Sequence, residues 1–167
     1  MSRKIQLSVT VFLYHQGKYL ILQRPHNNKV DSGRLNGVGG KVEANENFLQ
    51  TALRETQEET GYQLTEQEMQ FSGLIRTHDG YPCDWIVCFF TAAVASKTAP
   101  IGKKCREGKF LWLEPDELFT QGVELVDDLH YLFKEVVARK RVFFADIQFN
   151  DQEDVKKINV SYLPKNI

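Results

Sequence analysis

The chain has 167 residues, of which 42% are hydrophobic and 26% are charged. This length suits one well-cored domain and is short for two, so we expect a single domain over residues 1–167. Because the formal net charge is only −1, the sequence shows no electrostatic footprint for a nucleic-acid polymer or an anionic membrane, and neither partner is expected.

The N-terminal residues lack a long apolar run that ends in a small-residue cleavage site, and no other segment is apolar enough to span a bilayer. We therefore expect a cytoplasmic protein. Cysteines occur at Cys83, Cys88 and Cys105, an odd number without zinc-like spacing. Reduced thiols are expected there, rather than a disulfide framework or a metal site.

The first half of the chain begins with two apolar, partly alternating runs at 5–14 and 18–22, which predict a hairpin. A polar loop follows. The glycine-rich stretch 35–43 then predicts a short strand whose backbone can closely approach a ligand or metal. These three segments are expected to precede the first helix.

That helix is predicted over residues 47–60, because the segment consists mostly of good helix formers. Asn45 or Asn47 can serve as its N-cap, and Gly61 supplies a C-terminal stop. Beyond it, the apolar patterns predict strands at 69–76, 85–94, 110–113, 141–149 and 158–163, and a helix at 129–139. The mixture of helices and strands predicts an α/β protein.

Three carboxylates gather on one arc of the first helix, since Glu55, Glu58 and Glu59 are spaced i, i+3 and i+4. Such like charges destabilise a helix unless something neutralises them, and a divalent cation is the obvious partner. Hard oxygen ligands select Mg²⁺ or Mn²⁺, and Mg²⁺ held by few carboxylates predicts a phosphate substrate. The alternative interpretation is a solvated acidic helix face.

Arginine 54 lies within reach of this cluster. Arg54 can contact Glu58 at i+4 and can also pair with Glu46 or Glu55. We interpret it as a residue that orients one carboxylate while the others bind metal.

The segment 40–62 also matches a known catalytic motif, G-x5-E-x7-R-E-U-x-E-E-x-G-U, in which U is a bulky aliphatic residue. Its polar and glycine positions are filled by Gly40, Glu46, Arg54, Glu55, Glu58, Glu59 and Gly61. The two U positions depart from the pattern, with Thr56 and Tyr62. On these residues the segment closely resembles the Nudix hydrolases, which implies a Nudix-type α/β/α sandwich with a mixed central sheet and a catalytic loop-helix.

The resemblance extends to the MutT-like diphosphatases that remove 8-oxo-dGTP and other oxidised purine nucleotides from the nucleotide pool, especially the animal-type members. It is carried by the approach to the motif at 34–42, by Glu107 five residues before Trp112, by Val126-Asp127-Asp128 and, less specifically, by the final strand pair. The expected substrate is therefore a nucleotide.

The resemblance implies roles for residues at matching positions. Glu55, Glu58 and Glu59 would bind the divalent ion together with the backbone of Gly39 or Gly40. Glu107 would be an additional ligand or a base. Either Glu55 or Glu107 would activate water, and the sequence does not decide between them.

The resemblance likewise implies that Asn36 hydrogen-bonds the purine edge and that Asp127 and Asp128 read its other polar atoms. One of two adjacent buried aspartates can stay protonated and donate a hydrogen bond. Lys41 directly follows Gly39-Gly40 and is expected near the phosphates. The aromatic walls of the animal-type pocket are missing here, so we expect Tyr81 or Trp85 to supply a stacking surface.

Each of these substrate residues also has a purely structural interpretation. Asn36-Gly37 is a strong turn dipeptide, and an aspartate of the pair at 127–128 can be a helix N-cap. Glu107 can belong to a solvated charged loop, and Lys41 to a strand edge.

The predicted reaction is Mg²⁺-dependent hydrolysis of a nucleoside triphosphate, such as 8-oxo-dGTP, to a nucleoside monophosphate and pyrophosphate. The alternatives are a Nudix pyrophosphatase of different specificity, acting on ordinary nucleotides or another nucleoside diphosphate-X, and a non-catalytic nucleotide-binding Nudix domain. The sequence does not indicate the oligomeric state.

Overall fold

The computed structural model describes residues 3–26, 32–98 and 108–164. The strands are β1 (Ile5–His15), β2 (Lys18–Gln23), β3 (Leu35–Asn36), β4 (Gln70–His78), β5 (Asp84–Ala93), β6 (Lys109–Leu113), β7 (Phe143–Phe149) and β8 (Val155–Tyr162). The helices are α1 (Phe48–Thr60) and α2 (Asp127–Ala138), with short 3₁₀ helices η1 (Glu66–Glu68) and η3 (Glu117–Thr120). The two 3₁₀ helices were not predicted, whereas the two α-helices lie where the sequence patterns place them.

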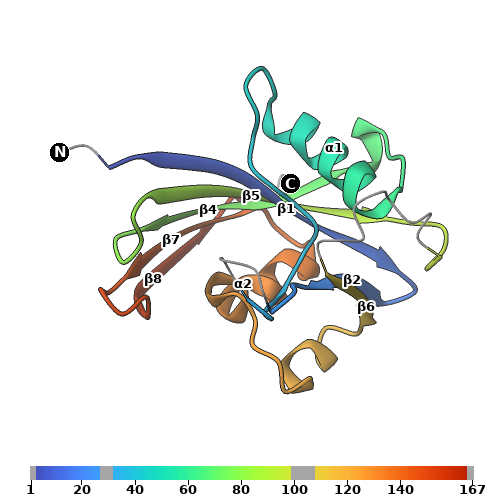
Figure 1. Ribbon diagram of the computed structural model, residues 1–167. Coiled ribbons are helices and arrows are strands. Elements are labelled where there is room, and N and C mark those ends of the chain that lie inside the picture. Colours follow the sequence, from blue (N-terminus) through green and yellow to red (C-terminus); the bar gives the residue numbers. More distant parts are fainter. Residues whose placement is uncertain (1–2, 27–31, 99–107, 165–167) are drawn as a thin grey trace.

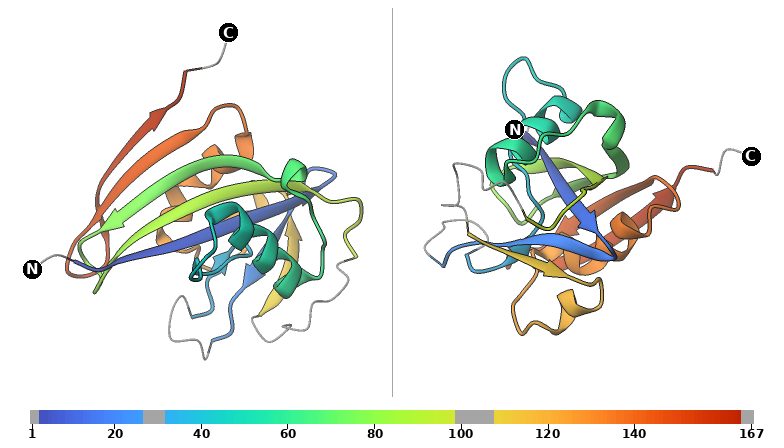
Figure 2. Two further views of the ribbon diagram at one scale, coloured as in Figure 1. Left: turned by 90° about the horizontal axis from the view of Figure 1, so that it is seen from above. Right: turned by 90° about the vertical axis from the view of Figure 1, so that its right-hand side faces the viewer.

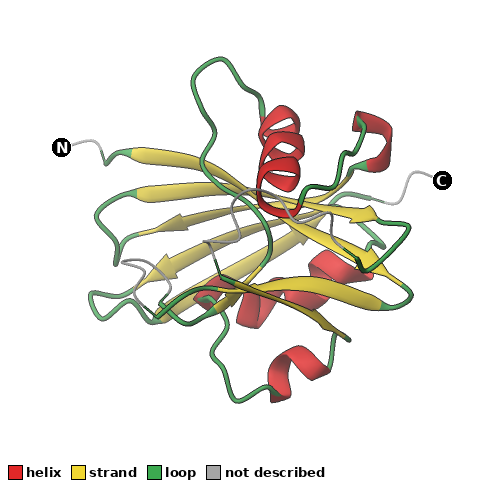
Figure 3. Ribbon diagram, turned by 45° about the vertical axis from the view of Figure 1, so that its right-hand side comes forward, coloured by secondary structure: helices red, strands yellow, loops and turns green. Residues whose placement is uncertain are grey.

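The eight strands of the described residues belong to one mixed sheet, in the order β3-β2-β1-β5-β4-β7-β8, with β6 paired to β2. The pairs β1–β5 and β4–β7 are parallel, and the other strand pairs are antiparallel. Helix α1 covers one face of the sheet and α2 the other (Figure 1). The predicted α/β/α sandwich is therefore confirmed, and the views in Figures 2 and 3 show the same layers from other sides.

The hairpin of β1 and β2 opens soon after its turn. Only Tyr14 and His15 of β1 pair with β2. Beyond them the glycine-rich stretch takes the place of β2 beside β1, where the amide of Val9 donates to the carbonyl of Gly40 at 2.9 Å. Two isolated bridges, Val11–Val38 and Ser8–Lys41, hold this stretch. The predicted strand at 35–43 is thus wrong in its extent: only β3 is regular, and the remainder makes single bridges.

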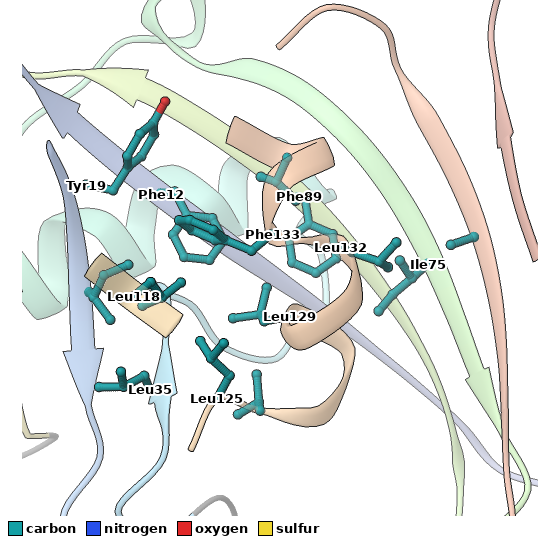
Figure 4. Close-up of a cluster of buried hydrophobic side chains, with 14 of the residues drawn as sticks. Phe12, Tyr19, Leu35, Ile75, Phe89, Leu118, Leu125, Leu129, Leu132 and Phe133 are labelled. Carbon is teal, nitrogen blue, oxygen red and sulfur yellow. The ribbon is translucent and has the colours of Figure 1, made fainter. Parts of the chain in front are cut away.

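Side chains of β1 alternate between two hydrophobic cores. Val9 and Val11 are buried together with Ala52 of α1, whereas Phe12 packs beneath α2. The ring centroids of Phe12 and Phe133 are 5.1 Å apart in an edge-to-face arrangement, within the cluster drawn in Figure 4. Since alternate residues of a strand face opposite sides, β1 lies between the α1 layer and the α2 layer.

No helix in the described parts of the chain is long and apolar enough to cross a membrane.

Candidate active site

Local capping interactions define both ends of α1. The side chain of Asn47 accepts a hydrogen bond from the amide of Gln50, and the side chain of Gln50 accepts from the amide of Asn47. This reciprocal capping box satisfies two backbone donors that a helix start leaves unpaired. At the other end Gly61 adopts φ 80°, a left-handed conformation that glycine reaches without strain.

Arg54 clamps the loop that precedes α1. Its guanidinium donates from Nε to Glu46 Oε1 at 2.7 Å and from Nη2 to Glu46 Oε2 at 3.1 Å. The hydroxyl of Thr51 donates to the same carboxylate at 2.9 Å. Chiefly because Arg54 donates to Glu46, the pKa of that carboxyl falls from 4.5 to about 2, and Glu46 in turn raises the pKa of Arg54.

The same guanidinium reaches the two nearest glutamates of α1. Arg54 Nη1 lies 2.7 Å from Glu55 Oε1 and 3.4 Å from Glu58 Oε2. The carboxylate of Glu55 also lies directly against the backbone of Gly40, since a Cβ atom at that glycine would overlap Oε1 and the carboxylate carbon of Glu55. Arg54 therefore makes all three contacts that the sequence allows it.

Glu59 is the buried member of the cluster, with only 2% of its surface exposed. Its Oε2 accepts a hydrogen bond from the amide of Gly39 at 3.2 Å. Gly39 has no room for a side chain either, because a Cβ would overlap the carbonyl of Val9 in β1. The carboxylates of Glu55 and Glu59 thus lie against one Gly39-Gly40 dipeptide, which β1 holds in place.

The arrangement fits a hard divalent cation by its chemistry. Glu55, Glu58 and Glu59 offer only oxygen donors, which are the ligands that Mg²⁺ and Mn²⁺ prefer, and they lie beside the half-buried Gly39-Gly40 backbone. Within the described ranges no three His, Cys, Asp or Glu side chains already form a group that could hold a metal. The reason is visible in the contacts: Arg54 holds Glu55, and the Gly39 amide holds Glu59. Glu107, the additional predicted ligand, lies outside the described residues.

Asn36 and Lys41 flank the glycines. Asn36 Oδ1 accepts from the amide of Gly37 at 2.7 Å, which leaves the side-chain NH₂ as a donor. The Asn36-Gly37 pair forms no turn, because Asn36 is the last residue of β3. The ammonium of Lys41 lies 5.5 Å from the centroid of the Trp85 ring, a cation–π contact.

Asp127 and Asp128 occupy the first turn of α2. The N-cap is Val126, without a side-chain hydrogen bond, so the N-cap interpretation of either aspartate is wrong. Asp127 Oδ2 instead accepts from Arg34 Nη1 at 2.8 Å and from the hydroxyl of Tyr81 at 3.0 Å. Asp128 Oδ1 accepts from the following amide at 3.0 Å.

Three residues hydrogen-bond to carboxylates of the candidate site although the sequence patterns did not indicate it: Arg34, Thr51 and Tyr81. The motif has an unspecified position at Thr51, and Tyr81 was considered only as a stacking ring. Its hydrogen bond to Asp127 spans 46 residues of sequence, and no local pattern predicts such a contact. Two further polar residues near Tyr81, Asp79 and Asp84, are bound by Gln148 and Arg3 respectively.

A family comparison agrees with the geometry. The model of the NUDIX domain matches residues 4–136 of the chain. A curated relative, the uncharacterized Nudix hydrolase YvcI of Bacillus subtilis, is 27% identical over 116 residues, which cover 68% of this chain and 69% of YvcI.

Solved structures show the same fold. The MutT protein of Bacillus halodurans superimposes with a TM-score of 0.76 at 22% identity, covering 93% of this chain and 97% of that protein. The NUDIX domain of Shewanella oneidensis NrtR, solved in complex with ADP ribose, has a TM-score of 0.63 at 17% identity over 83% of this chain and 89% of its own. With its motif glutamates on α1 and a domain match over most of its length, the chain belongs to the NUDIX family and is a Nudix hydrolase.

Proposed function

We propose that this Nudix hydrolase is a Mg²⁺-dependent diphosphatase that converts 8-oxo-dGTP, or another oxidised purine nucleoside triphosphate, to the monophosphate and pyrophosphate. The observation that carries the proposal is the placement of Glu55 and Glu59 against Gly39-Gly40, beside an arginine that also clamps Glu46. Mn²⁺ is the alternative ion. We assign the activity to one domain over residues 1–167, in the cytoplasm.

In this mechanism Glu55, Glu58 and Glu59 would hold the divalent ion, together with backbone of Gly39 or Gly40. When bound, such an ion neutralises charge that develops on the phosphates and favours ionisation of water. A glutamate, Glu55 or Glu107, takes the proton of the attacking water. In-line attack at phosphorus breaks one phosphoanhydride bond and releases the monophosphate and pyrophosphate.

The remaining residues orient the substrate. The ammonium of Lys41 is assigned to the phosphate chain, because it follows the glycines and is exposed. The Asn36 amide donates to a purine acceptor, and Asp127 and Asp128 face its donors. Trp85 supplies a ring beside Lys41, and aromatic rings stack on bases without regard to their exact pattern of donors.

A nucleoside diphosphate linked to another group is the second candidate substrate. It is favoured by the structural similarity to the NrtR domain that binds ADP ribose. The same carboxylates would serve either substrate, since both contain a phosphoanhydride. A non-catalytic nucleotide-binding domain is the further alternative, and the intact set of glutamates on α1 argues against it.

The test of the chemistry is Glu58→Gln, which removes one charge from the cation site while keeping the size of the side chain. Pyrophosphate release from 8-oxo-dGTP should fall by about 10²-fold or more, because a metal contributes several kcal/mol of charge stabilisation. Glu66→Gln, an exposed glutamate in η1, is the matched control and should keep wild-type turnover. Full Mg²⁺-dependent activity of Glu58→Gln would contradict the site.

A substrate panel tests the base assignment separately. It compares 8-oxo-dGTP, 2-oxo-dATP, the common dNTPs, nucleoside diphosphate sugars and diadenosine polyphosphates. Preference for an oxidised purine supports the proposal. Preference for a diphosphate sugar would refute the purine assignment and leave the metal chemistry intact.

A further inference from the structure

The two positions at which the motif segment departs from its pattern, Thr56 and Tyr62, are joined in the structure. The hydroxyl of Thr60 donates to the carbonyl of Thr56 at 2.5 Å. The same hydroxyl oxygen accepts from the backbone amide of Tyr62 at 3.2 Å. Since a hydroxyl can donate and accept at once, Thr60 connects the last turn of α1 to the residue that follows Gly61.

The phenol of Tyr62 continues this chain of hydrogen bonds away from the helix. Its hydroxyl donates to the carbonyl of Ser96 at 2.5 Å, across 34 residues of sequence, while its ring packs against the hydrophobic core beneath α1. Burial raises the pKa of Tyr62, so the phenol keeps its proton and remains a donor. The aliphatic side chain that the motif specifies at this position has no group that can make this bond.

The segment that receives this bond is itself attached to the sheet on both sides. The amide of Val94 donates to the carbonyl of Tyr14, near the end of β1, at 2.9 Å. The indole Nε1–H of Trp112, in β6, donates to the carbonyl of Lys97 at 3.1 Å. Ser96 lies between these two attachments. A hydrogen bond to its carbonyl therefore ties the end of α1 to the sheet.

Two of the glutamates assigned to the metal lie in the turn of α1 that precedes this attachment. Glu58 and Glu59 come four and three residues before Tyr62, which is about one turn of helix. Arg54, which clamps Glu46, attaches the earlier part of the helix to its loop. The hydroxyl of Tyr62 supplies a second attachment, at the opposite end of the helix.

We propose that Tyr62 is a positioning residue for the metal site. Its hydrogen bond to Ser96 fixes the last turn of α1 and, with it, the two glutamates of that turn. Because ligands that are oriented before an ion arrives lose little freedom on binding it, this attachment raises the affinity for a divalent cation. The inference rests on the proposed function, which assigns Glu58 and Glu59 to the ion, but it does not depend on which nucleotide is hydrolysed.

Tyr62→Phe tests the inference, because it removes the hydroxyl and keeps the ring. Binding of Mn²⁺ to the nucleotide-free protein is measured by electron paramagnetic resonance of the free ion. The dissociation constant should rise about two- to tenfold, the change that corresponds to one lost hydrogen bond. The Mg²⁺ concentration for half-maximal activity should rise by the same factor, while KM for the nucleotide at saturating Mg²⁺ stays unchanged.

Hydrogen exchange in the metal-free protein gives a second readout, which needs neither ion nor substrate. In Tyr62→Phe the amides of residues 57–60 should exchange about two- to tenfold faster than in wild type, since the last turn of α1 has lost an attachment and opens more often. The amides of residues 51–54, at the other end of the helix, should exchange as in wild type.

Thr56→Val is the matched control. It removes a buried hydroxyl that has no hydrogen-bond partner in the part of the chain that the structure describes, and it leaves the backbone carbonyl that Thr60 contacts. It should keep the wild-type dissociation constant for Mn²⁺ and wild-type exchange. Thr60→Val removes both bonds of the connecting hydroxyl and should act in the same direction as Tyr62→Phe. Circular dichroism identifies any loss of fold in Thr60→Val, and the comparison is then judged on Tyr62→Phe.

The outcomes separate this inference from the proposed activity. If Tyr62→Phe binds Mn²⁺ as tightly as wild type, the inference is overturned while the diphosphatase activity stands, even if Tm falls, because the bond then serves stability alone. If wild type binds no Mn²⁺, the inference fails together with the proposed metal site. If wild type binds Mn²⁺ in a Tyr62-dependent way yet hydrolyses no nucleotide, the proposed activity fails and the positioning role stands.

Discussion

At the scale of single residues, the two adjacent glycines have different neighbours. An added Cβ at Gly39 would overlap the backbone carbonyl of Val9, which belongs to the central strand β1. The three atoms nearest to an added Cβ at Gly40 all belong to the carboxylate of Glu55, the end of a flexible side chain. The absence of a side chain at Gly39 therefore leaves room for the backbone of β1, whereas at Gly40 it leaves room for the carboxylate of Glu55, to which we assign a catalytic role.

We predict that Gly40→Ala loses activity without losing stability, because Glu55 can rotate away from the new methyl group. Gly39→Ala should instead lose roughly 1–3 kcal/mol of unfolding free energy, the usual cost of overpacking. Urea denaturation and pyrophosphate release, measured on both variants, distinguish the two effects. Equal losses of stability in both variants would contradict this division.

At the scale of elements, one arginine joins the loop before α1 to the helix itself. Arg54 lies in the second turn of α1, and its bidentate pair with Glu46 is supplemented by the buried hydroxyl of Thr51. These hydrogen bonds join the loop to the helix. This connection depends on the charge of Glu46, and hence on pH.

The stability that Glu46 supplies should disappear in acid. Its pKa is lowered from 4.5 to about 2 in the folded protein, so the unfolded chain takes up the proton first as the pH falls. The contribution of the ionised Glu46 carboxylate to the free energy of unfolding is complete above about pH 4.5 and is lost as the pH approaches 2. Urea midpoints of wild type and Glu46→Gln should therefore differ at pH 6 and converge at pH 2.

Glu66→Gln, a change at an exposed glutamate, should have the same urea midpoint as wild type at every pH of this series. If the urea midpoints of wild type and Glu46→Gln still differ by the same amount at pH 2, the charge of the Glu46 carboxylate does not account for the stabilising contact between the loop and α1.

At the scale of the whole molecule, helix α1 and its glutamates were predictable, because helix spacing and capping are local properties of the sequence. The hairpin turn was predictable for the same reason. The resemblance placed Glu59 and the backbone of Gly39 or Gly40 in one site, but the direct hydrogen bond from the Gly39 amide to Glu59 was not predicted, since the two residues lie 20 positions apart. That contact exists only because the glycine stretch replaces β2 beside β1, and strand order is not encoded by periodicity. For the same reason the sequence did not predict that Arg34 and Tyr81 donate to Asp127.

Magnesium should stabilise the entire fold, because a ligand that binds only the native state shifts the unfolding equilibrium. At about one hundred times the dissociation constant the gain is about 2.7 kcal/mol, or about 5–10 °C in Tm for a chain of this size. Differential scanning calorimetry with MgCl₂ and with NaCl of equal ionic strength measures it. Glu58→Gln should lose most of the shift, and an equal shift in that variant would place the ion elsewhere.

The bridges from β1 to the glycine stretch have a further consequence for substrate affinity. Val9 and Val11 donate backbone hydrogen bonds to Gly40 and Val38 at 2.9 and 2.6 Å, and all three valines are buried. Ordering a flexible segment on binding would cost about 1–2 kcal/mol for each residue. In this protein the segment is already ordered by folding. We therefore expect that binding of the substrate phosphates does not have to order this loop, and that the affinity is higher for this reason.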